Sequence, residues 1–431
     1  MSEREYVSIV LFVQDDVHRL EKCLCHILDY TPALEYEMIV VECKDCRAVH
    51  EYLQALPNIQ IIAYGSGMSI GARWQKASKL ATGGHIVFLQ DSVCVLENWL
   101  TGLGDVMRSH KDAAVVQPFM EPQQGNVCED ALFIFENCCM INREMLFSLG
   151  GIIESYNTDF FCLGDLSFRL LKAEKRIFCT TSCQIDYAGI QYEQLDEMLL
   201  LEDRDEYTKR NGFDWYYSTR CRTEMLACID YTKPDIQVLD IGCSCGATLM
   251  AIRNKNPKAH LYGLELCEQS AKVAGNFAEV RNENFEELVW DDYNGKFDFV
   301  IMGDVLEHLF HTDRALQKVK QWLRPGGKLI VSVPNVSHVS VLSGALQGRW
   351  DYQEAGILDK THVRFFTVQS IGECLRKNGF GKIHLYSKTI AISADDEKLI
   401  QELTGIKLFA VKVDDLVTYQ VICLAEKTDA K

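Results

Sequence analysis

The stretch Gln237–Leu249, QVLDIGCSCGATL, decides the fold of the second half of this 431-residue chain. An apolar, strand-like run ends at Asp240 and enters a loop of small residues, after which a helix is expected to begin near Ala247. Gly242 and Gly246 allow the backbone to turn sharply and to approach a ligand closely. The N-terminus of the helix offers free N–H groups. Packing turns also use glycine, so the stretch predicts a strand–loop–helix unit and leaves its ligand open.

Outward from this unit, strands continue to alternate with helices. The runs HLYGLE, FDFVIMG and KLIVSVPN are expected strands, and KIHLYSKTI and TYQVICLAE could form an antiparallel edge. This order predicts a doubly wound α/β domain. Glu265 ends the strand after the loop, where a carboxylate can accept both hydroxyls of a ribose. A solvated strand end and a helix N-terminal acid are the alternatives for Glu265. The loop lacks the Gly-x-Gly-x-x-Gly register of a pyrophosphate site, which favours a nucleoside over a dinucleotide.

Two further motifs follow in order, MGDVLEHL (Met302–Leu309) and WLRPGGKLIVSVPN (Trp322–Asn335). With them, residues 230–431 resemble a class I S-adenosylmethionine-dependent methyltransferase. The resemblance implies a Rossmann-like fold and S-adenosyl-L-methionine as the cofactor. It also implies four groups of cofactor contacts: a loop around the methionine part, an acid on the ribose, a pair at the adenine and an aspartate below the methyl group. The loop residues are Asp240, Gly242, Cys243, Ser244 and Gly246. The acid on the ribose is Glu265, the pair at the adenine is Asn284 and Phe285, and the aspartate below the methyl group is Asp304. Asn284 stands where an acid is usual, and its amide oxygen can still accept a hydrogen bond.

The 18 cysteines do not form a metal-binding pattern. Cys43-x-x-Cys46 has no second Cys-x-x-Cys beside it, so we interpret it as structural rather than as half of a zinc site or a redox pair. Cys243 and Cys245 are expected to be loop residues beside the cofactor and not metal ligands. The sequence therefore predicts no metal site.

The segment His338–Thr367, HVSVLSGALQGRWDYQEAGILDKTHVRFFT, interrupts the domain after its fifth strand. Insertions there usually cover the acceptor pocket in the family that this half resembles. GILDKTHVRFFT also resembles a signature common among bacterial methyltransferases encoded with sugar-transfer enzymes. Aromatic rings suit the apolar faces of sugars and polar groups suit their hydroxyls, so the candidate acceptor-binding residues are Trp350, Tyr352, Asp359 and Arg364. The alternative is a packed strand, with Phe365 and Phe366 in the core and Thr367 as the N-cap of the next helix.

Three histidines are candidates for the general base that a hydroxyl acceptor needs. Histidine is the default residue for this role because its pKa lies near neutrality. His308 follows the strand that meets the methyl group and ranks first, His362 ranks second, and His338 is the third candidate. A structural or substrate-orienting histidine is the alternative for each of them.

The first half also alternates strands and helices. Val7–Val13, Glu37–Glu42, Asn58–Gly65 and His85–Gln90 are expected strands, and a helix is expected from about Ile70 to Leu80. This order predicts a second, mostly parallel, doubly wound sheet.

Residues 6–190 resemble the GT-A catalytic domain of family-2-type glycosyltransferases, through VSIVLFVQDD, EMIVVE, SIGARWQKASKLATGGHIVFLQDSVCVLENWL and the run from CCMINREMLF to EKRIF. Three positions that carry chemistry in that family depart from its pattern. The metal-binding Asp-x-Asp falls on Gln90-Asp91-Ser92, the base position on Cys162-Leu163-Gly164, and the late histidine on Asp186-Tyr187. Glu42 replaces an aspartate that faces the nucleotide base, a mild change. We interpret this half as a degenerate nucleotide-sugar site, marked by Glu42 and Asp91, that does not transfer sugar.

Length and charge limit the remaining possibilities. The expected organisation is a GT-A-like domain over residues 1–195, a helical connector over 196–229 and a methyltransferase domain over 230–431. The net charge of -17 argues against a nucleic-acid partner. The N-terminus is a poor secretory signal, and no apolar run is long enough for a transmembrane segment. A cytoplasmic protein is therefore expected, with its oligomeric state open.

These features together predict a methyltransferase that methylates a sugar hydroxyl of a surface glycan or glycoconjugate. The first half would then help to recognise the acceptor, and it could retain affinity for a nucleotide-sugar. One alternative is a bifunctional glycosyltransferase–methyltransferase. Another is a small-molecule methyltransferase for which the first half is only a scaffold. A pure interaction protein with two inactive sites is disfavoured, because the cofactor motifs are nearly complete.

Overall fold

The computed structural model describes residues 6–31, 36–65, 67–119, 123–135, 137–187, 197–288, 291–406 and 410–428. The chain divides into two compact units, residues 1–219 and 220–431. Each unit has its own sheet and its own hydrophobic core. The expected boundary at residues 195 and 196 falls in the segment 188–196, outside the described residues.

The first unit is built on an eight-stranded sheet of order β3-β2-β1-β4-β8-β6-β9-β7, with a separate two-stranded ribbon of β10 and β5. The strands are β1 (Val7–Val13), β2 (Tyr36–Glu42), β3 (Ile59–Ile62), β4 (His85–Gln90), β5 (Val93–Val95), β6 (Ala113–Pro118), β7 (Cys128–Ala131), β8 (Cys138–Asn142), β9 (Arg176–Thr180) and β10 (Ile185–Tyr187). The helices are α1 (Val17–Tyr30), α2 (Arg47–Gln54), α3 (Ile70–Leu80), α4 (Trp99–Ser109), α5 (Arg143–Ser148), α6 (Asp159–Lys172), α7 (Glu197–Asn211) and α8 (Trp215–Ser218).

The parallel half of this sheet follows the expected βαβαβ order. β1 pairs in parallel with β2 and β4, and β2 pairs in parallel with β3. Beyond β4 the sheet becomes mixed, because β8 runs antiparallel to both β4 and β6, and β7 runs antiparallel to β9. The sequence predicted the parallel half, and the reversal at β8 is a feature that it did not predict.

The predicted helical connector divides between the two units. α7 and α8 pack on α6 of the first unit, where Trp215 lies among the rings of Phe160, Phe168 and Tyr207, with centroid distances of 4.8, 5.3 and 5.5 Å. In contrast, α9 (Thr223–Leu226) belongs to the second unit, and its Met225 is fully buried there. Aromatic burial therefore draws α8 onto the first unit, instead of leaving the segment as a free linker.

The second unit contains a seven-stranded sheet of order β13-β12-β11-β14-β15-β17-β16. Its strands are β11 (Gln237–Ile241), β12 (His260–Leu264), β13 (Glu279–Arg281), β14 (Phe297–Gly303), β15 (Leu323–Pro334), β16 (Phe380–Thr389) and β17 (Thr418–Lys427). Besides α9, its helices are α10 (Ala247–Lys255), α11 (Glu268–Ala274), α12 (Thr312–Trp322), α13 (Val339–Leu346), α14 (Val368–Lys377), α15 (Ala394–Gly405) and α16 (Val413–Val417), with 3₁₀ turns η1 (Asp291–Tyr293) and η2 (Leu306–His308).

Alternate residues of this sheet feed two cores, one on each face. Leu239 packs in a core with residues of α12 and α14, whereas its neighbour Val238 packs in a core with residues of α9 and α10. The sheet is parallel from β13 to β15, and β17 runs antiparallel to β15 and β16, which confirms the expected antiparallel edge. The chain leaves the central strand β11 toward β12 on one side, and β14 pairs on the other side. This is the switch point at which open α/β sheets bind ligands.

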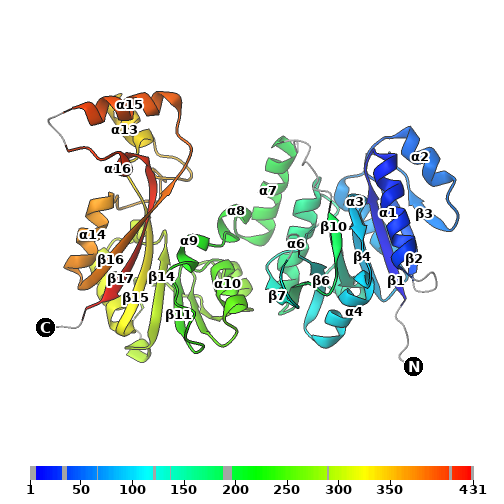
Figure 1. Cartoon of the computed structure of the whole chain (residues 1–431), viewed down its shortest axis with the longest axis horizontal. Coiled ribbons are helices and arrows are strands. Elements are labelled where there is room, and N and C mark those ends of the chain that lie inside the picture. Colours follow the sequence, from blue (N-terminus) through cyan, green and yellow to red (C-terminus); the bar gives the residue numbers. More distant parts are fainter. Residues whose placement is uncertain are drawn as a thin grey trace. The chain divides into compact units, whose positions relative to one another are not determined.

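A small helical cap completes the second unit. α13, α15 and α16 share a core that contains Val339, Ile400 and Leu416. Figure 1 shows these helices gathered beyond one end of the strands β16 and β17. Of these helices, α13 follows β15 and lies within the predicted insertion His338–Thr367, whereas α15 and α16 follow β16 and lie outside it. No described helix in either unit is long and apolar enough to cross a membrane.

Candidate functional site

The loop after β11 has the conformation that its glycines permit. Gly242 and Gly246 have φ angles of 74° and 79°, in the left-handed region, and Ser244 between them has a φ of 49°. A Cβ atom at Gly246 would lie 2.9 Å from the Cα atom of Ala274, so α10 begins where only glycine fits. The N–H of Gly242 donates to the carbonyl of Leu264 at 2.8 Å, which ties the loop to the end of β12.

Glu265, directly after β12, is held by this loop. Its carboxylate accepts a hydrogen bond from the N–H of Ser244 at 2.8 Å and another from the N–H of Cys267 at 2.8 Å. A carboxylate has about four lone-pair sites, so two remain free after these bonds. Glu265 is thus oriented by backbone groups and can still accept two hydroxyl donors.

Asp240 and Cys243 are buried under the loop. Burial raises the pKa of Asp240 to about 7, against the opposing charge of Arg222. Burial also raises the pKa of the Cys243 thiol well above its usual range, so this side chain is a packing group. Cys245 is buried as well.

The pair expected at the adenine divides between surface and core. Asn284 is exposed, and its side-chain oxygen accepts from the N–H of Glu286 at 3.0 Å, as in an Asx turn. Phe285 is buried in the core of the α12 face, 5.8 Å from the ring of Trp322. The structure therefore leaves Asn284 accessible to a ligand and gives Phe285 a packing position.

Asp304 follows the end of β14 and has a φ of 55°. Its carboxylate pairs with the guanidinium of Arg222 at 2.5 Å and accepts hydrogen bonds from the hydroxyl of Ser332, at 2.7 Å, and from the amide of Gln420. Burial alone would raise the pKa of Asp304, but the charge of Arg222 and these hydrogen bonds hold it below its usual value. Asp304 is therefore an ionised, fixed carboxylate at the ends of β14, β15 and β17.

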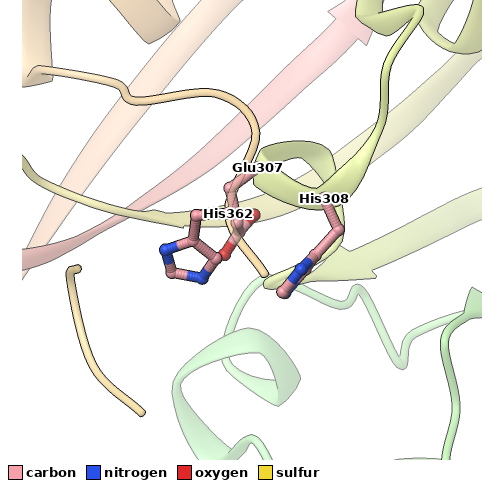
Figure 2. A group of neighbouring side chains, drawn as sticks. All are labelled: Glu307, His308 and His362. Carbon is pink, nitrogen blue, oxygen red and sulfur yellow. The ribbon is translucent and has the colours of Figure 1, made fainter. Parts of the chain in front are cut away.

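The side chains of Glu307, His308 and His362 form a cluster. Glu307 is the third residue after Asp304 in the sequence. One ligand-type atom from each side chain lies within 4.8 Å of the others, and Figure 2 shows the Glu307 carboxylate between the two imidazoles. The two rings are 4.8 Å apart in a T-shaped arrangement. Burial and the charge of Asp304 raise the pKa of Glu307 well above its usual value, and burial and His362 lower the pKa of His308. The structure thus brings together two of the three candidate histidines.

His338, the third candidate, lies outside this cluster. It is the N-cap of α13, and its Nδ1 accepts from the N–H of Ser340 at 3.3 Å. It is 1% exposed, and burial lowers its pKa. Its position explains the helix start, and it favours the structural role that was the alternative for this histidine.

The residues expected to bind the acceptor lie in the same segment of the chain as His362. Trp350 and Tyr352 are 43% and 59% exposed, while the carboxylate of Asp359 accepts from the N–H and hydroxyl of Thr361 at 2.7 and 2.6 Å. Arg364 is exposed and donates to the carbonyl of Phe310 at 2.8 Å. Trp350 and Tyr352 are free to contact a ligand, whereas Asp359 and Arg364 also hold the backbone of the segment. Thr367 caps α14 in a capping box, as predicted, and Phe366 is a core residue.

In the first unit, the two predicted nucleotide-sugar residues are buried and bonded. The Glu42 carboxylate accepts from the N–H of Tyr64 at 2.9 Å and lies 2.8 Å from Nδ1 of His50. Asp91 is 1% exposed and accepts from the N–H of Gln14 at 3.0 Å and from the guanidinium of Arg19 at 3.2 Å. Burial raises the pKa of Asp91, although both of these donors oppose the shift. Asp91 therefore ties β1 and α1 to the end of β4.

The base position of the first unit is closed. Cys162, Leu163 and Gly164 lie on α6 and are buried. A Cβ atom at Gly164 would lie 2.5 Å from a ring carbon of Trp215 in α8. Asp165 accepts from Arg169 Nε at 2.6 Å and from the Asn211 amide at 3.1 Å, so its carboxylate holds α6 to the end of α7.

Four residues of the candidate site were not among the predicted site residues. Glu307 stands next to His308 in the sequence, and this adjacency was the available signal. Arg222, Ser332 and Gln420 reach Asp304 from distant segments, and no local pattern indicates such contacts.

Part of the chain, including most of the second unit, matches a known family model. Residues 213–385 match the family model described as "Methyltransferase domain". The chain is 32% identical over 109 residues to trans-aconitate 2-methyltransferase of Deinococcus radiodurans, covering 25% of this chain and 42% of that protein. It is 24% identical over 244 residues to the human mitochondrial ubiquinone biosynthesis O-methyltransferase, covering 52% of this chain and 64% of that protein. The chain thus spans less than two thirds of the length of either relative.

One solved structure that matches the chain shares a lower sequence identity with it than these relatives do. The crystal structure of GalNAc-T7 with UDP, GalNAc and Mn2+ matches with a TM-score of 0.43 and 11% identity, covering 54% of this chain and 53% of that one. The family match concerns mainly the second half of the chain. The second half of the chain carries an S-adenosylmethionine-dependent methyltransferase domain, and S-adenosylmethionine is its cofactor.

The geometry of the second unit fits this cofactor. The positive-φ loop of Gly242 and Gly246 lies beside Glu265, whose two remaining lone-pair sites suit a pair of ribose hydroxyls. Asp304 lies at the neighbouring strand end, and all these groups gather at the switch point of the sheet.

Proposed function

We propose that the chain O-methylates a sugar hydroxyl of a glycan or glycoconjugate. The observation that carries this proposal is the segment after β15, which presents Trp350 and Tyr352 on the surface close in sequence to His362 and Arg364. Exposed aromatic rings can pack against the apolar faces of sugar rings.

The proposed mechanism assigns binding and positioning to this chain's residues. S-adenosylmethionine supplies the methyl group on a sulfonium sulfur. The Gly242–Gly246 loop and Glu265 would hold the cofactor, and Asp304, fixed by Arg222 and Ser332, would set the edge of the methyl site. Holding the acceptor oxygen in line with the methyl carbon can supply much of the rate. A histidine of the Glu307, His308 and His362 cluster would accept the proton of the acceptor hydroxyl.

For the first unit we propose a GT-A-like module that has lost sugar transfer and contributes to acceptor recognition. The support is chemical: the single aspartate of Gln90-Asp91-Ser92 is bonded to Arg19, and Cys162-Leu163-Gly164 offer no base under Trp215. An α/β fold alone does not establish transfer activity. Release of nucleoside diphosphate from any nucleotide-sugar by the purified chain would contradict this part and favour a bifunctional enzyme.

The first test is cofactor binding by calorimetry. We expect wild-type chain to bind S-adenosylmethionine, and Glu265→Gln to bind it about 10–100-fold more weakly, because hydrogen bonds to a charged group contribute about 1.5–3 kcal/mol. Glu268→Gln is the matched control, since Glu268 is exposed and pairs only with Lys272 on the surface of α11. Equal affinities for all three proteins would refute the assigned cofactor site.

The second test identifies the acceptor. Mass spectrometry of host glycans with and without this protein should show a difference of one methyl group on a sugar. Unchanged glycans, with cofactor binding intact, would contradict the sugar acceptor and leave the methyltransferase assignment standing.

A small-molecule acceptor is the second candidate. The relatives described above are named for trans-aconitate and for ubiquinone biosynthesis, which are small molecules. Methylation of such a molecule by residues 220–431 alone, at the rate of the whole chain, would favour this candidate, because the first unit would then be dispensable.

A further inference from the structure

Glu307, His308 and His362 bring one carboxylate and two imidazoles together. Methyl transfer alone does not require such a group of side chains. Glu307 and His308 come from η2, directly after β14, and His362 comes from the segment between α13 and α14. The N–H groups of Val363 and Arg364 both donate to the carbonyl of Glu307, at 2.9 and 3.0 Å. This backbone clamp fixes the two segments side by side, so the meeting of the three side chains is built into the fold.

Both imidazoles are oriented in the same way by their Nδ1 atoms. Nδ1 of His362 lies 3.0 Å from the carbonyl of Ile357. Nδ1 of His308 lies 3.3 Å from the carbonyl of Thr361 and 3.2 Å from its hydroxyl oxygen, whose own proton is donated to Asp359. A carbonyl can only accept, so each Nδ1 carries the proton and each Nε2 keeps its lone pair. Asp359 in turn binds the N–H and hydroxyl of Thr361. Metal-binding histidines are typically oriented in this manner by carbonyl and carboxylate groups behind them.

Glu307 provides the second, independent observation. It is 1% exposed, and among the described residues neither of its carboxylate oxygens has a hydrogen-bond partner. A buried carboxylate without partners is strongly unfavourable unless it is neutralised or coordinates a cation. Its oxygens are aimed into the space shared with the two imidazoles.

We propose that Glu307, His308 and His362 bind a divalent transition-metal cation. Two imidazole nitrogens and one carboxylate oxygen suit Zn²⁺, Mn²⁺, Fe²⁺ or Co²⁺ better than Ca²⁺ or Mg²⁺, which prefer oxygen ligands. Metal–ligand bonds of about 2.0–2.2 Å place ligand atoms roughly 3–3.5 Å apart. The observed ligand atoms lie within 4.8 Å of one another, so binding of a cation would draw them together by about 1–2 Å.

The cation also has a role that rests on the proposed function. Three protein ligands leave a coordination position open, and the cluster begins three residues after Asp304 at the edge of the methyl site. With a cation bound, His308 and His362 would act as ligands instead of as the base named above, and an acceptor hydroxyl at the open position would release its proton to water more readily. The oxygen lone pair then forms the bond to the methyl carbon as the carbon–sulfur bond breaks toward sulfur, and S-adenosylhomocysteine leaves as a neutral thioether. The substrate class is thereby narrowed to acceptors that present a hydroxyl to a metal.

The test measures metal binding directly, without an acceptor. The purified full chain is stripped with a chelator and titrated with Co²⁺, Zn²⁺, Mn²⁺ and Mg²⁺, and the bound metal is counted by mass spectrometry. We expect one tightly bound transition ion per chain, and visible absorption bands typical of Co²⁺ with nitrogen ligands. Mg²⁺ should bind much more weakly.

Three variants and one control assign the ligands. Glu307→Gln, His308→Gln and His362→Gln are each expected to weaken binding at least about 100-fold and to change the Co²⁺ spectrum. His311→Gln is the matched control, because His311 is an exposed histidine three residues after His308 and lies outside the cluster. Circular dichroism and S-adenosylmethionine affinity of each variant report whether it is folded.

The outcomes separate this inference from the proposed function. If the wild-type chain binds no transition ion, or if His362→Gln and Glu307→Gln bind it like wild type, the metal site is refuted. Normal cofactor binding in that experiment would leave the methyltransferase intact, with the cluster acting as an acid–base group. Metal binding without methylation of any sugar would refute the acceptor proposal and retain the metal site.

Discussion

The carboxyl group of Asp240 makes the stability of the second unit depend on pH. This group is buried, and its pKa is raised to about 7 from about 3.9 in an unfolded chain. The folded state therefore holds a proton that the unfolded state has lost between about pH 4 and pH 7. The stabilisation is complete below pH 4 and is lost as the pH rises toward 7. Asp240→Asn removes the charge, so we expect the cofactor-free variant to be more stable than wild type at pH 8 by on the order of 4 kcal/mol.

Urea unfolding of the cofactor-free protein at pH 5 and pH 8 measures this effect. The difference between variant and wild type should be small at pH 5 and large at pH 8. An equal difference at both pH values would show that Asp240 does not titrate in this range.

The Arg222–Asp304 pair is a second prediction at the residue scale. The two side chains are 15% and 20% exposed, and removal of one partner leaves a poorly solvated charge. We expect Arg222→Met to destabilise the second unit by about 2–4 kcal/mol. The double variant Arg222→Met/Asp304→Asn should be more stable than the sum of the single changes predicts, because it removes both charges. Additive effects in urea unfolding would indicate that the pair contributes nothing of its own.

Sequence reasoning reached single residues unevenly. Asp240, Gly242, Gly246, Glu265 and Asp304 stand at strand ends or in a glycine loop, and local patterns indicate such positions. The contact of His308 with His362 depends on the backbone clamp between Glu307 and the segment after Thr361, which no short pattern specifies. Asn284 and Phe285 were expected to act together at the adenine. Asn284 is exposed and the next residue, Phe285, is in the core, a difference that the local pattern did not reveal.

At the scale of elements, α14 begins with a capping box. The Thr367 hydroxyl accepts from the N–H of Ser370 at 3.1 Å, and the Ser370 hydroxyl accepts from the N–H of Thr367 at 2.8 Å. Thr367→Ala should therefore destabilise the second unit by about 1 kcal/mol. Gln369→Ala, on the exposed side of the same helix, is the control and should have little effect. Equal unfolding midpoints for Thr367→Ala and wild type would contradict the capping role.

The strands and helices themselves were largely predictable. β1, α3 and β4 have the expected bounds, because each is a clear apolar run or a helical face bounded by turn residues. The expected strand Asn58–Gly65 shortens to β3 (Ile59–Ile62), at the edge of the sheet. The insertion of β8 between β4 and β6 was not predictable, because strand order and direction depend on long-range pairing rather than on local pattern.

At the scale of the whole molecule, the division of the chain predicts where it can be cut. The sheet and both cores of the second unit lie within residues 220–431. This fragment should fold alone and bind S-adenosylmethionine as the full chain does. A fragment starting at residue 230, the boundary expected from sequence, lacks α9 with its buried Met225 and Leu226, and also lacks Arg222.

We therefore expect the fragment 230–431 to be less stable by several kcal/mol, since loss of a large buried apolar side chain alone removes about 2–5 kcal/mol. Circular dichroism melting of both fragments measures the difference. Equal melting temperatures would show that α9 is dispensable for the second unit.

The ring of Trp215 over Gly164 limits what this turn of α6 can become. A side chain at position 164 would collide with the indole, because a Cβ atom there would lie 2.5 Å from a ring carbon. An acid introduced at Cys162 or Leu163 would be an unpaired charge buried in the aromatic cluster. Evolution of an acidic group here therefore requires several simultaneous changes. If the first unit is the degenerate module proposed above, this packing acts as a ratchet that opposes the return of a catalytic base.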